Sequence, residues 1–177
     1  MRRDLVDTYL HWTNDPVVMR GNGRAEPETR ENLAAGTDVR LAGDNLHFTV
    51  YDTTRTADDG GPLPVGTTSL SIDDYVGTAE FFIVLGEEGR GRSLAARATR
   101  LTLQAAFDHG LRSVYLAVLE RNTPAIRAYA RAGFQRIGVR RACGWWDGEV
   151  CGEVLMDAVP SDLAQSTLSP AASARPR

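Results

Sequence analysis

The stretch Gly86-Glu87-Glu88-Gly89-Arg90-Gly91-Arg92-Ser93-Leu94 has the residue types of a phosphate-binding loop. Its glycines allow the backbone to turn tightly and to bring successive N–H groups toward one point. An apolar run that predicts a strand precedes it, and a helical pattern follows, so unpaired N–H groups and a positive dipole end lie beside the loop. The side chains of Arg90 and Arg92 add full charges. The stretch therefore predicts a cradle for a phosphate or pyrophosphate.

Taken alone, this cradle (residues 86–94) fits equally well a glycine-rich turn with two solvated arginines, because short glycine motifs recur by chance. It is not a Walker loop, since no Gly-Lys-Ser/Thr follows. It is not a convincing dinucleotide fingerprint either, since no acidic residue ends a second strand about 20 residues further on. The choice between a ligand site and a simple turn depends on a second motif downstream.

That second motif lies one predicted helix and one predicted strand further along. Residues 119–134, Leu-Glu-Arg-Asn-Thr-Pro-Ala-Ile-Arg-Ala-Tyr-Ala-Arg-Ala-Gly-Phe, resemble the Asn-x-x-Ala…Tyr-x-x-x-Gly-Phe segment of the GNAT superfamily of N-acetyltransferases. Residues 12–18, Trp-Thr-Asn-Asp-Pro-Val-Val, and the last predicted hairpin resemble the RimJ/RimL-like branch of that superfamily. The resemblance covers residues 4–158, and the order and spacing of the two motifs are more specific than either motif alone.

The resemblance implies a GNAT fold over residues 1–159. This is an α+β (mixed α/β) domain with a central, mostly antiparallel twisted sheet, splayed at the acetyl-CoA site and flanked by helices. The first strand of the family would lie before residue 2, so that strand is expected to be absent. Residues 160–177, rich in Ser, Ala and Pro, are expected to form a disordered tail.

Acetyl-CoA is the co-substrate that the resemblance implies. Backbone N–H groups of the cradle would hold its diphosphate, the edge of the preceding strand would pair with the pantetheine amides, and an asparagine would contact the same arm. The implied residues are Ile83, Val84, Leu85, Arg90, Gly91, Arg92, Ser93, Leu94 and Asn122. Two positions depart from the family: Ser93 replaces a glycine, and Glu88 replaces Gln or Arg with a carboxylate that would repel phosphate unless it points away.

Direct transfer to an amine in a ternary complex needs a base for the amine and an acid for the departing thiolate. The resemblance places Tyr129 beside the sulfur as that acid, with simple packing as its alternative role. Glu80, on the strand that leads to the cradle, is the candidate base, with an ion pair at the sheet edge as the alternative. The three histidines are expected to be structural or solvated, and no residue is assigned to a metal.

The acceptor is less well defined. The family positions that line its pocket correspond to Trp12, Arg20, Asn22 and Trp145, a mixture that suits a small polar amine with some flat or apolar body, such as a metabolite or an antibiotic-like compound. The second hypothesis is acetylation of a protein N-terminus, as by ribosomal-protein acetyltransferases. A third, from another class, is a CoA-binding module without catalysis.

Composition is compatible with this assignment. At 177 residues, 42% hydrophobic and 24% charged, the chain has the length of one globular domain. A net charge of -3 gives no reason to expect a nucleic-acid partner. No apolar run reaches the roughly 18 residues that a membrane span needs, so a cytoplasmic location is expected. A homodimer is compatible with the sequence.

The periodicity of apolar residues predicts alternating helices and strands. One stripe of the helix at 93–109, with Leu94, Ala98, Leu101 and Ala105, is expected to face the core. The expected helices span residues 4–14, a short turn from 16, 27–35, 93–109 and 123–132, and the expected strands span 46–52, 65–72, 79–85, 113–119, 134–146 and 149–158. Residues 53–64 are expected to form a long loop, and Asp147-Gly148 a tight type I′ turn.

Overall fold

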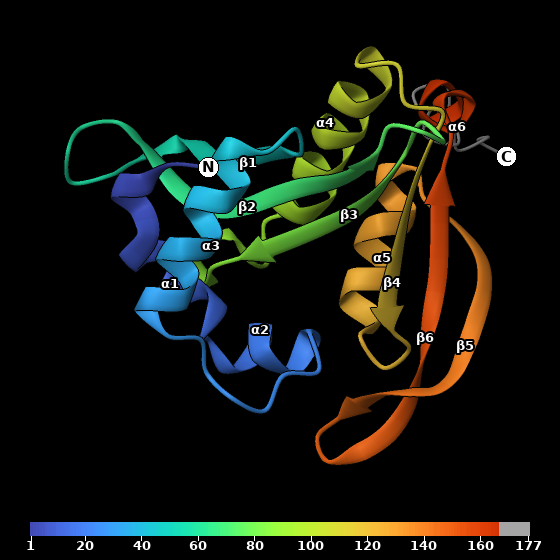
Figure 1. Cartoon of the computed structure of the whole chain (residues 1–177), viewed down its shortest axis with the longest axis horizontal. Coiled ribbons are helices and arrows are strands. Elements are labelled where there is room, and N and C mark those ends of the chain that lie inside the picture. The colour runs from blue at the N-terminus through green and yellow to red at the C-terminus, as the bar shows by residue number, and fades with distance from the viewer. Residues whose placement is uncertain (167–177) are drawn as a thin grey trace, which may run out of the picture.

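The computed structural model describes residues 1–166 and has six strands in a single sheet, with helices on both faces (Figure 1). The strand order is β1-β2-β3-β4-β6-β5. The strands are β1 (Leu46–Thr56), β2 (Pro62–Asp73), β3 (Thr78–Leu85), β4 (Ser113–Leu119), β5 (Gln135–Trp146) and β6 (Glu149–Ala158). The helices are η1 (Arg3–Leu5), α1 (Val6–Thr13), α2 (Pro16–Gly21), α3 (Arg30–Ala42), η2 (Glu87–Gly89), α4 (Leu94–Asp108), α5 (Thr123–Ala132) and α6 (Pro160–Ser166). The predicted mixed α+β fold, a sheet flanked by helices, is confirmed.

The sheet splits in the middle, as the family resemblance implies. All neighbouring strands are antiparallel except β3 and β4, which run parallel because α4 connects them as a crossover. Their pairing covers only three residue pairs and ends at Glu80 opposite Tyr115. Beyond that pair the two strands separate toward their C-terminal ends (Figure 1). The C-terminal half of β3 is therefore left with one edge that β4 does not cover.

Helices α4 and α5 cover one face of the sheet, but the stripe predicted for α4 is displaced. Leu101 is 72% exposed, whereas the buried side chains are Ala98, Thr99, Thr102, Leu103 and Ala106. Thr102 can be buried because its hydroxyl donates to the carbonyl of Ala98 (3.0 Å) and shares a hydrogen bond with Thr68 of β2 (2.7 Å). A prediction that considers only apolar residues therefore misplaces the buried face of α4, which includes two threonines.

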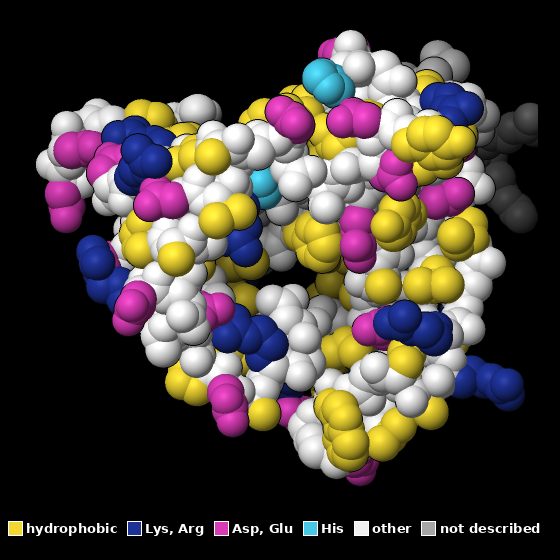
Figure 2. All heavy atoms as spheres, in the orientation of Figure 1, with side chains coloured by type: hydrophobic (Ala, Val, Ile, Leu, Met, Phe, Trp, Pro, Cys, Tyr) yellow, Lys and Arg dark blue, Asp and Glu magenta, His cyan; other side chains and the backbone are white. Residues whose placement is uncertain are grey.

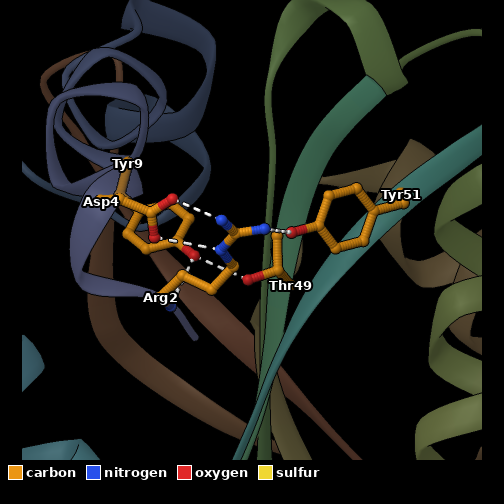
Figure 3. A network of polar contacts seen from close by, with 5 residues as sticks. All are labelled: Arg2, Asp4, Tyr9, Thr49 and Tyr51. Atoms are coloured by element: carbon orange, nitrogen blue, oxygen red, sulfur yellow. Dashed lines mark hydrogen bonds and ion pairs between the residues drawn. The ribbon is translucent and has the colours of Figure 1, made fainter. Parts of the chain in front are cut away.

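The N-terminal helices pack on the other face, against β1 to β3. Tyr9 and Trp12 of α1 form a small core with Leu33 of α3 and with Val84 of β3. A polar network fixes the same helix to β1 (Figure 3). The hydroxyl of Tyr9 bonds that of Thr49 (2.6 Å) and accepts the backbone N–H of Arg2 (3.0 Å), and the Arg2 guanidinium reaches Tyr51. The contacts hold α1 at a fixed height above the sheet.

The predicted bounds of α3 and of the first hairpin are wrong. α3 begins after Thr29, whose hydroxyl accepts the N–H of Asn32, and continues through Gly36. A glycine in a helix interior costs only about 1 kcal/mol, which tertiary packing of Leu33 and Thr37 offsets. The strands of the first hairpin extend over most of the segment predicted as a loop, because they continue their antiparallel pairing to Thr56 and Pro62.

The C-terminal part confirms one prediction and corrects another. Asp147 and Gly148 have φ angles of 51° and 81°, as a type I′ turn between β5 and β6 requires. The segment from Pro160, predicted to be disordered, begins with α6 because Leu163 is buried at 5% exposure and its carbonyl accepts from Arg100 (2.9 Å). Residues 167–177 of the predicted tail lie outside the described residues. Within residues 1–166, no helix has the length and apolar character to cross a membrane.

Candidate active site

The cradle places a run of free backbone donors at the N-terminus of α4. The 3₁₀ turn η2 closes with a hydrogen bond from the N–H of Arg90 to the carbonyl of Glu87 (3.2 Å), so the donor of Arg90 is occupied. Gly91 and Ser93 then take left-handed conformations, with φ of 70° and 58°. In the described chain, the N–H groups of residues 91 to 94 have no acceptor. Such a run of donors, on the positive end of a 15-residue helix, fits a diphosphate.

The two arginines of the cradle have structural partners, contrary to the prediction that both charges face the ligand. The guanidinium of Arg90 pairs with Asp15 (2.8 Å) and donates to the carbonyl of Leu85 (3.2 Å). Asp15 also caps α2 by accepting the N–H groups of Val17 and Val18. Burial raises the pKa of the Asp15 carboxyl, but these hydrogen bonds outweigh it and lower the pKa overall. Arg90 therefore ties the cradle to α2.

Arg92 ties the cradle to β1 in the same way. Its guanidinium lies 2.6 Å from the buried carboxylate of Asp52 and donates to the hydroxyl of Thr54 (3.1 Å). Hydrogen bonds from Thr54, together with the charge of Arg92, lower the pKa of Asp52. Because both guanidinium groups are paired with carboxylates, the groups that the cradle presents to a ligand are its backbone N–H donors.

Glu88 does not oppose an anion, because its carboxylate turns inward. Its Oε2 atom is buried and, like the indole Nε1 of Trp12, lacks a hydrogen-bond partner in the described chain. A Cβ atom placed on Gly86 would lie 2.6 Å from Glu88 Oε2 and 2.2 Å from Trp12 Nε1. Gly86 thus packs directly against Trp12 of α1, and only a hydrogen atom fits there.

We expect Gly86→Ala to lower the free energy of unfolding by about 1–3 kcal/mol, because the new methyl group must displace the buried indole. Urea unfolding measures this change. Gly138→Ala is the matched control, since a Cβ at that position meets no atom within 4 Å. Equal stability of the two variants would contradict the packing described here.

Tyr129 lies on α5 with its ring against the C-terminal half of β3. The ring makes edge contacts with Phe81 (centroids 6.1 Å apart) and Phe134 (6.0 Å). No hydrogen-bond partner of its hydroxyl is present among the described residues, and burial raises the pKa of Tyr129 to about 12. The phenol therefore keeps its proton over the whole physiological range and can act as a donor.

Glu80 lies at the last residue pair before β3 and β4 separate. Phe81 faces α5 and Tyr129, so the preceding residue, Glu80, points to the opposite face of the sheet. Its carboxylate has no ion-pair partner within residues 1–166, which disfavours the edge ion pair considered as its alternative role. Burial and then the charge of Glu80 raise the pKa of Tyr115, its neighbour on β4. Glu80 and Tyr129 thus approach the gap from opposite faces.

The remaining residues implied as cofactor contacts lie along the same gap. Ile83, Val84 and Leu85 form the end of β3 that β4 leaves uncovered, and the carbonyl of Leu85 is already taken by Arg90. Asn122 follows β4 and caps α5 through its side-chain oxygen, which accepts the N–H of Ala125 (3.3 Å). Its role as a contact of the cofactor arm stays a prediction.

A cavity of about 430 Å³ lies between the N-terminal helices and the face of β1 to β3 that carries Glu80. Figure 2 shows this side of the molecule hollowed at its centre, between the N-terminal helices and the strands β4, β6 and β5. Its polar lining residues are Tyr9, Thr13, Asn22, Arg24, Glu28, Arg40, Asn45, His47, Thr67, Thr68, Ser69 and Ser71, and Trp12, Leu33, Phe82 and Val84 are among its apolar ones. Its volume is that of a small-molecule site.

Two of the four predicted acceptor residues line this cavity. Asn22 does so from the end of α2, and Trp12 does so with only 1% of its surface exposed, so it mainly packs in the core. Arg20 instead stacks over Trp146 (5.2 Å) and pairs with Asp147 (3.7 Å), which joins α2 to the last hairpin. Trp145 is 59% exposed and lies outside the cavity lining.

Sequence reasoning missed the charged wall of the cavity. Arg24 and Glu28 lie in the segment between α2 and α3, and Arg40 lies on α3. The position of these segments over the sheet is decided by tertiary packing. His47 was predicted to be structural or solvated, yet it lines the cavity. The alternation of residues 46 to 50 on β1 predicts that His47 and Thr49 share one face of the sheet. It does not predict which face the N-terminal helices cover.

Comparisons with known proteins agree with this geometry. Residues 1–135 match the model of the acetyltransferase (GNAT) domain family. An uncharacterized N-acetyltransferase of Bacillus subtilis, YobR, is 33% identical over 73 residues, and this match spans 41% of the present chain but only 28% of that relative.

Solved structures share the fold over nearly the whole chain. The spermidine N-acetyltransferase of Vibrio cholerae, in complex with CoA and spermine, aligns with a TM-score of 0.81 at 20% identity, covering 93% of this chain and 95% of the other. The ribosomal-protein-alanine N-acetyltransferase of Brucella melitensis aligns with a TM-score of 0.73 at 14% identity, covering 90% and 96%. At these identities the likeness establishes the fold, and the RimJ/RimL-like branch stays a prediction.

Proposed function

The chain belongs to the GNAT acetyltransferase family, and from this premise we propose that it transfers the acetyl group of acetyl-CoA to the primary amine of a small molecule. The observation that carries the proposal is the run of free N–H groups at residues 91 to 94, beside the gap between β3 and β4. Tyr129 and Glu80 border this gap from its two sides. The cavity volume favours a small molecule as the acceptor, rather than the surface of a folded protein.

The chain's own groups fit acetyl-CoA, the co-substrate of this family. The N–H groups of Gly91, Arg92, Ser93 and Leu94 would hold its diphosphate, and the free edge of β3 at Ile83 and Val84 would bind the pantetheine amides. When bound, acetyl-CoA supplies an acetyl group activated as a thioester. The aromatic rings of Phe81 and Phe134 keep water from the side of the gap where Tyr129 lies.

In this proposal Glu80 serves as the base. An alkylammonium must lose a proton before its nitrogen can attack, and the Glu80 carboxylate, on the sheet face that the acceptor cavity covers, would accept that proton directly or through water. Ser71 of β2 lies opposite Glu80 in the strand register and lines the cavity, which connects the carboxylate to the bound acceptor.

Tyr129 stabilises the departing sulfur by donating a hydrogen bond. Its pKa of about 12 lies above the value of about 8.5 that is typical of a thiol, so the phenol lowers the energy of the developing thiolate without complete proton transfer. The proton released by the amine can then neutralise the thiolate. The acid assigned from the sequence is therefore better described as a hydrogen-bond donor.

For Glu80→Gln we expect kcat/KM at pH 7 to fall about tenfold and to approach the wild-type value at high pH, where the free amine needs no base. The pH dependence of kcat/KM for the amine measures this. An unchanged profile would remove Glu80 from the mechanism. Exposed Glu31→Gln, in the first turn of α3 and outside the cavity lining, is the control for the loss of one surface charge.

The proposed function is tested by measuring thiol release from acetyl-CoA with a panel of primary amines, with mass spectrometry of the products. We expect an acetylated small amine. A peptide with a free N-terminus belongs in the panel, because it represents acetylation of protein termini. The proposal fails if acetyl-CoA binds and no small amine is acetylated.

A further inference from the structure

We propose that the acceptor is a primary amine whose other end carries an acid, a carboxylate or a phosphonate, bound by a basic wall made of Arg40 and His47. This inference rests on the proposed function and names the substrate class of the same site. It is carried by the charges of the cavity and by the position of this wall relative to Glu80.

The cavity carries more basic than acidic side chains. Its charged lining side chains are Arg24, Arg40 and Glu28. The only acid among them already faces Arg24 at 3.7 Å, so those two charges largely compensate each other. Arg40 has no carboxylate partner among the described residues, and its guanidinium folds back along α3 beside Gly36. An uncompensated positive charge therefore remains at this end of the cavity.

His47 adds a hydrogen-bonding group that the fold leaves unused. Its Nε2 atom is buried and has no partner in the described chain. Burial lowers the pKa of the His47 imidazole, and the charge of Arg40 lowers it further, which reflects the positive potential at this place. A neutral imidazole has one N–H to donate. A buried polar group without a partner is costly, and an acceptor oxygen of the ligand would satisfy it.

The strand register sets the distance between the basic wall and the base. His47 on β1 lies opposite Ser69 on β2, which lies opposite Phe82 on β3, and Glu80 is two residues from Phe82 on the same face. Since neighbouring strands are about 4.8 Å apart, the backbone at His47 lies roughly 10 Å from β3. An acceptor with its amine at Glu80 must be several bonds long to reach the wall, and the hydroxyls of Ser69 and Ser71 lie between.

The same wall disfavours a polyamine. The structural relative from Vibrio cholerae was solved with spermine, a polycation. In the present cavity a distal ammonium would meet Arg40, and Glu28 is already paired with Arg24. Like charges at close range cost free energy, so the wall discriminates by repulsion as well as by attraction.

Three acceptors that differ only at their distal end test this inference: 6-aminohexanoate, 6-aminohexanamide and 1,6-diaminohexane. We expect kcat/KM to decrease in that order, with the acid at least about 100-fold above the diamine. A phosphonate analogue of equal length distinguishes the two kinds of acid. Preference for the amide or the diamine overturns the inference and leaves the proposed function standing, whereas acetylation of no primary amine overturns the function itself.

Arg40→Gln should raise KM for 6-aminohexanoate about tenfold with little change in kcat, and Arg40→Glu should shift the preference toward the diamine. The side chain is exposed on α3, so both variants should fold, which thermal unfolding verifies. Arg131→Gln, on the exposed surface of α5, controls for the loss of one positive charge. An Arg40→Glu enzyme that keeps the wild-type order of the three acceptors would overturn the role of the wall.

Discussion

Tyr129→Phe is expected to lower kcat by about 10²- to 10³-fold while KM for acetyl-CoA stays nearly unchanged. The substitution removes only the hydroxyl, which no residue in the described chain binds, and keeps the ring between Phe81 and Phe134. The loss therefore falls on the transition state, in which charge develops on the sulfur, and not on binding or folding. Steady-state kinetics by thiol release measures both constants.

Tyr75→Phe is the matched control, because Tyr75 is 98% exposed in the turn between β2 and β3, at the other end of β3 from the cradle. The pKa of about 12 adds a second expectation: wild-type kcat should show no decline from ionisation of Tyr129 below about pH 10. If Tyr129→Phe keeps most of its kcat, the tyrosine only packs, and the sulfur is stabilised by another group.

Gly91→Asp is expected to weaken binding of CoA about 10- to 100-fold, whereas Gly91→Asn weakens it only slightly. Both side chains tolerate the left-handed backbone at this position, φ 70°, and a Cβ there meets no atom within 4 Å. The two variants have nearly the same shape and differ in charge, so the difference between them isolates the repulsion of a diphosphate by a carboxylate.

Titration calorimetry with CoA measures this difference, and it should shrink as salt is added, because solvent-exposed charges are screened. Thermal unfolding without ligand should show the two variants equally stable. Equal affinity of the aspartate and asparagine variants for CoA would show that the diphosphate does not lie at residues 91 to 94.

Features with local causes were predictable from the sequence. The turn at Asp147-Gly148 needs positive φ angles, and Asn122 caps the helix that Pro124 begins. The glycines of the cradle marked a loop before a helix, and that helix ends before Gly110, whose φ is 94°. Each of these features depends on residues within a few positions of one another.

Features that depend on long-range contacts were not predictable in this way. Arg90 pairs with Asp15, 75 positions earlier in the chain, and the partners of Arg92 are on β1. No local pattern distinguishes these arginines from solvated ones. The docking of α3 over the sheet, which brings Arg40 and His47 to the same cavity, is likewise decided by the packing of Leu33 and Thr37.

Family resemblance supplied the roles proposed for Tyr129 and Glu80, but two of the predicted acceptor positions do not line the cavity. Arg20 belongs to the contact between α2 and the last hairpin, where its guanidinium pairs with Asp147 and stacks over Trp146. Trp145 is exposed and lies outside the cavity lining. Acceptor pockets are built from variable helices and loops, so they follow the individual sequence more than the fold.

Thermal unfolding in the presence of acetyl-CoA, CoA or ATP tests the central claim most directly. A ligand at about 100 times its Kd adds roughly 2.7 kcal/mol to the stability of the folded state. If the cradle holds the diphosphate and the open edge of β3 holds the pantetheine arm, both CoA compounds raise the unfolding temperature and ATP, which lacks that arm, raises it little. An unfolding temperature that neither CoA compound changes would contradict the account.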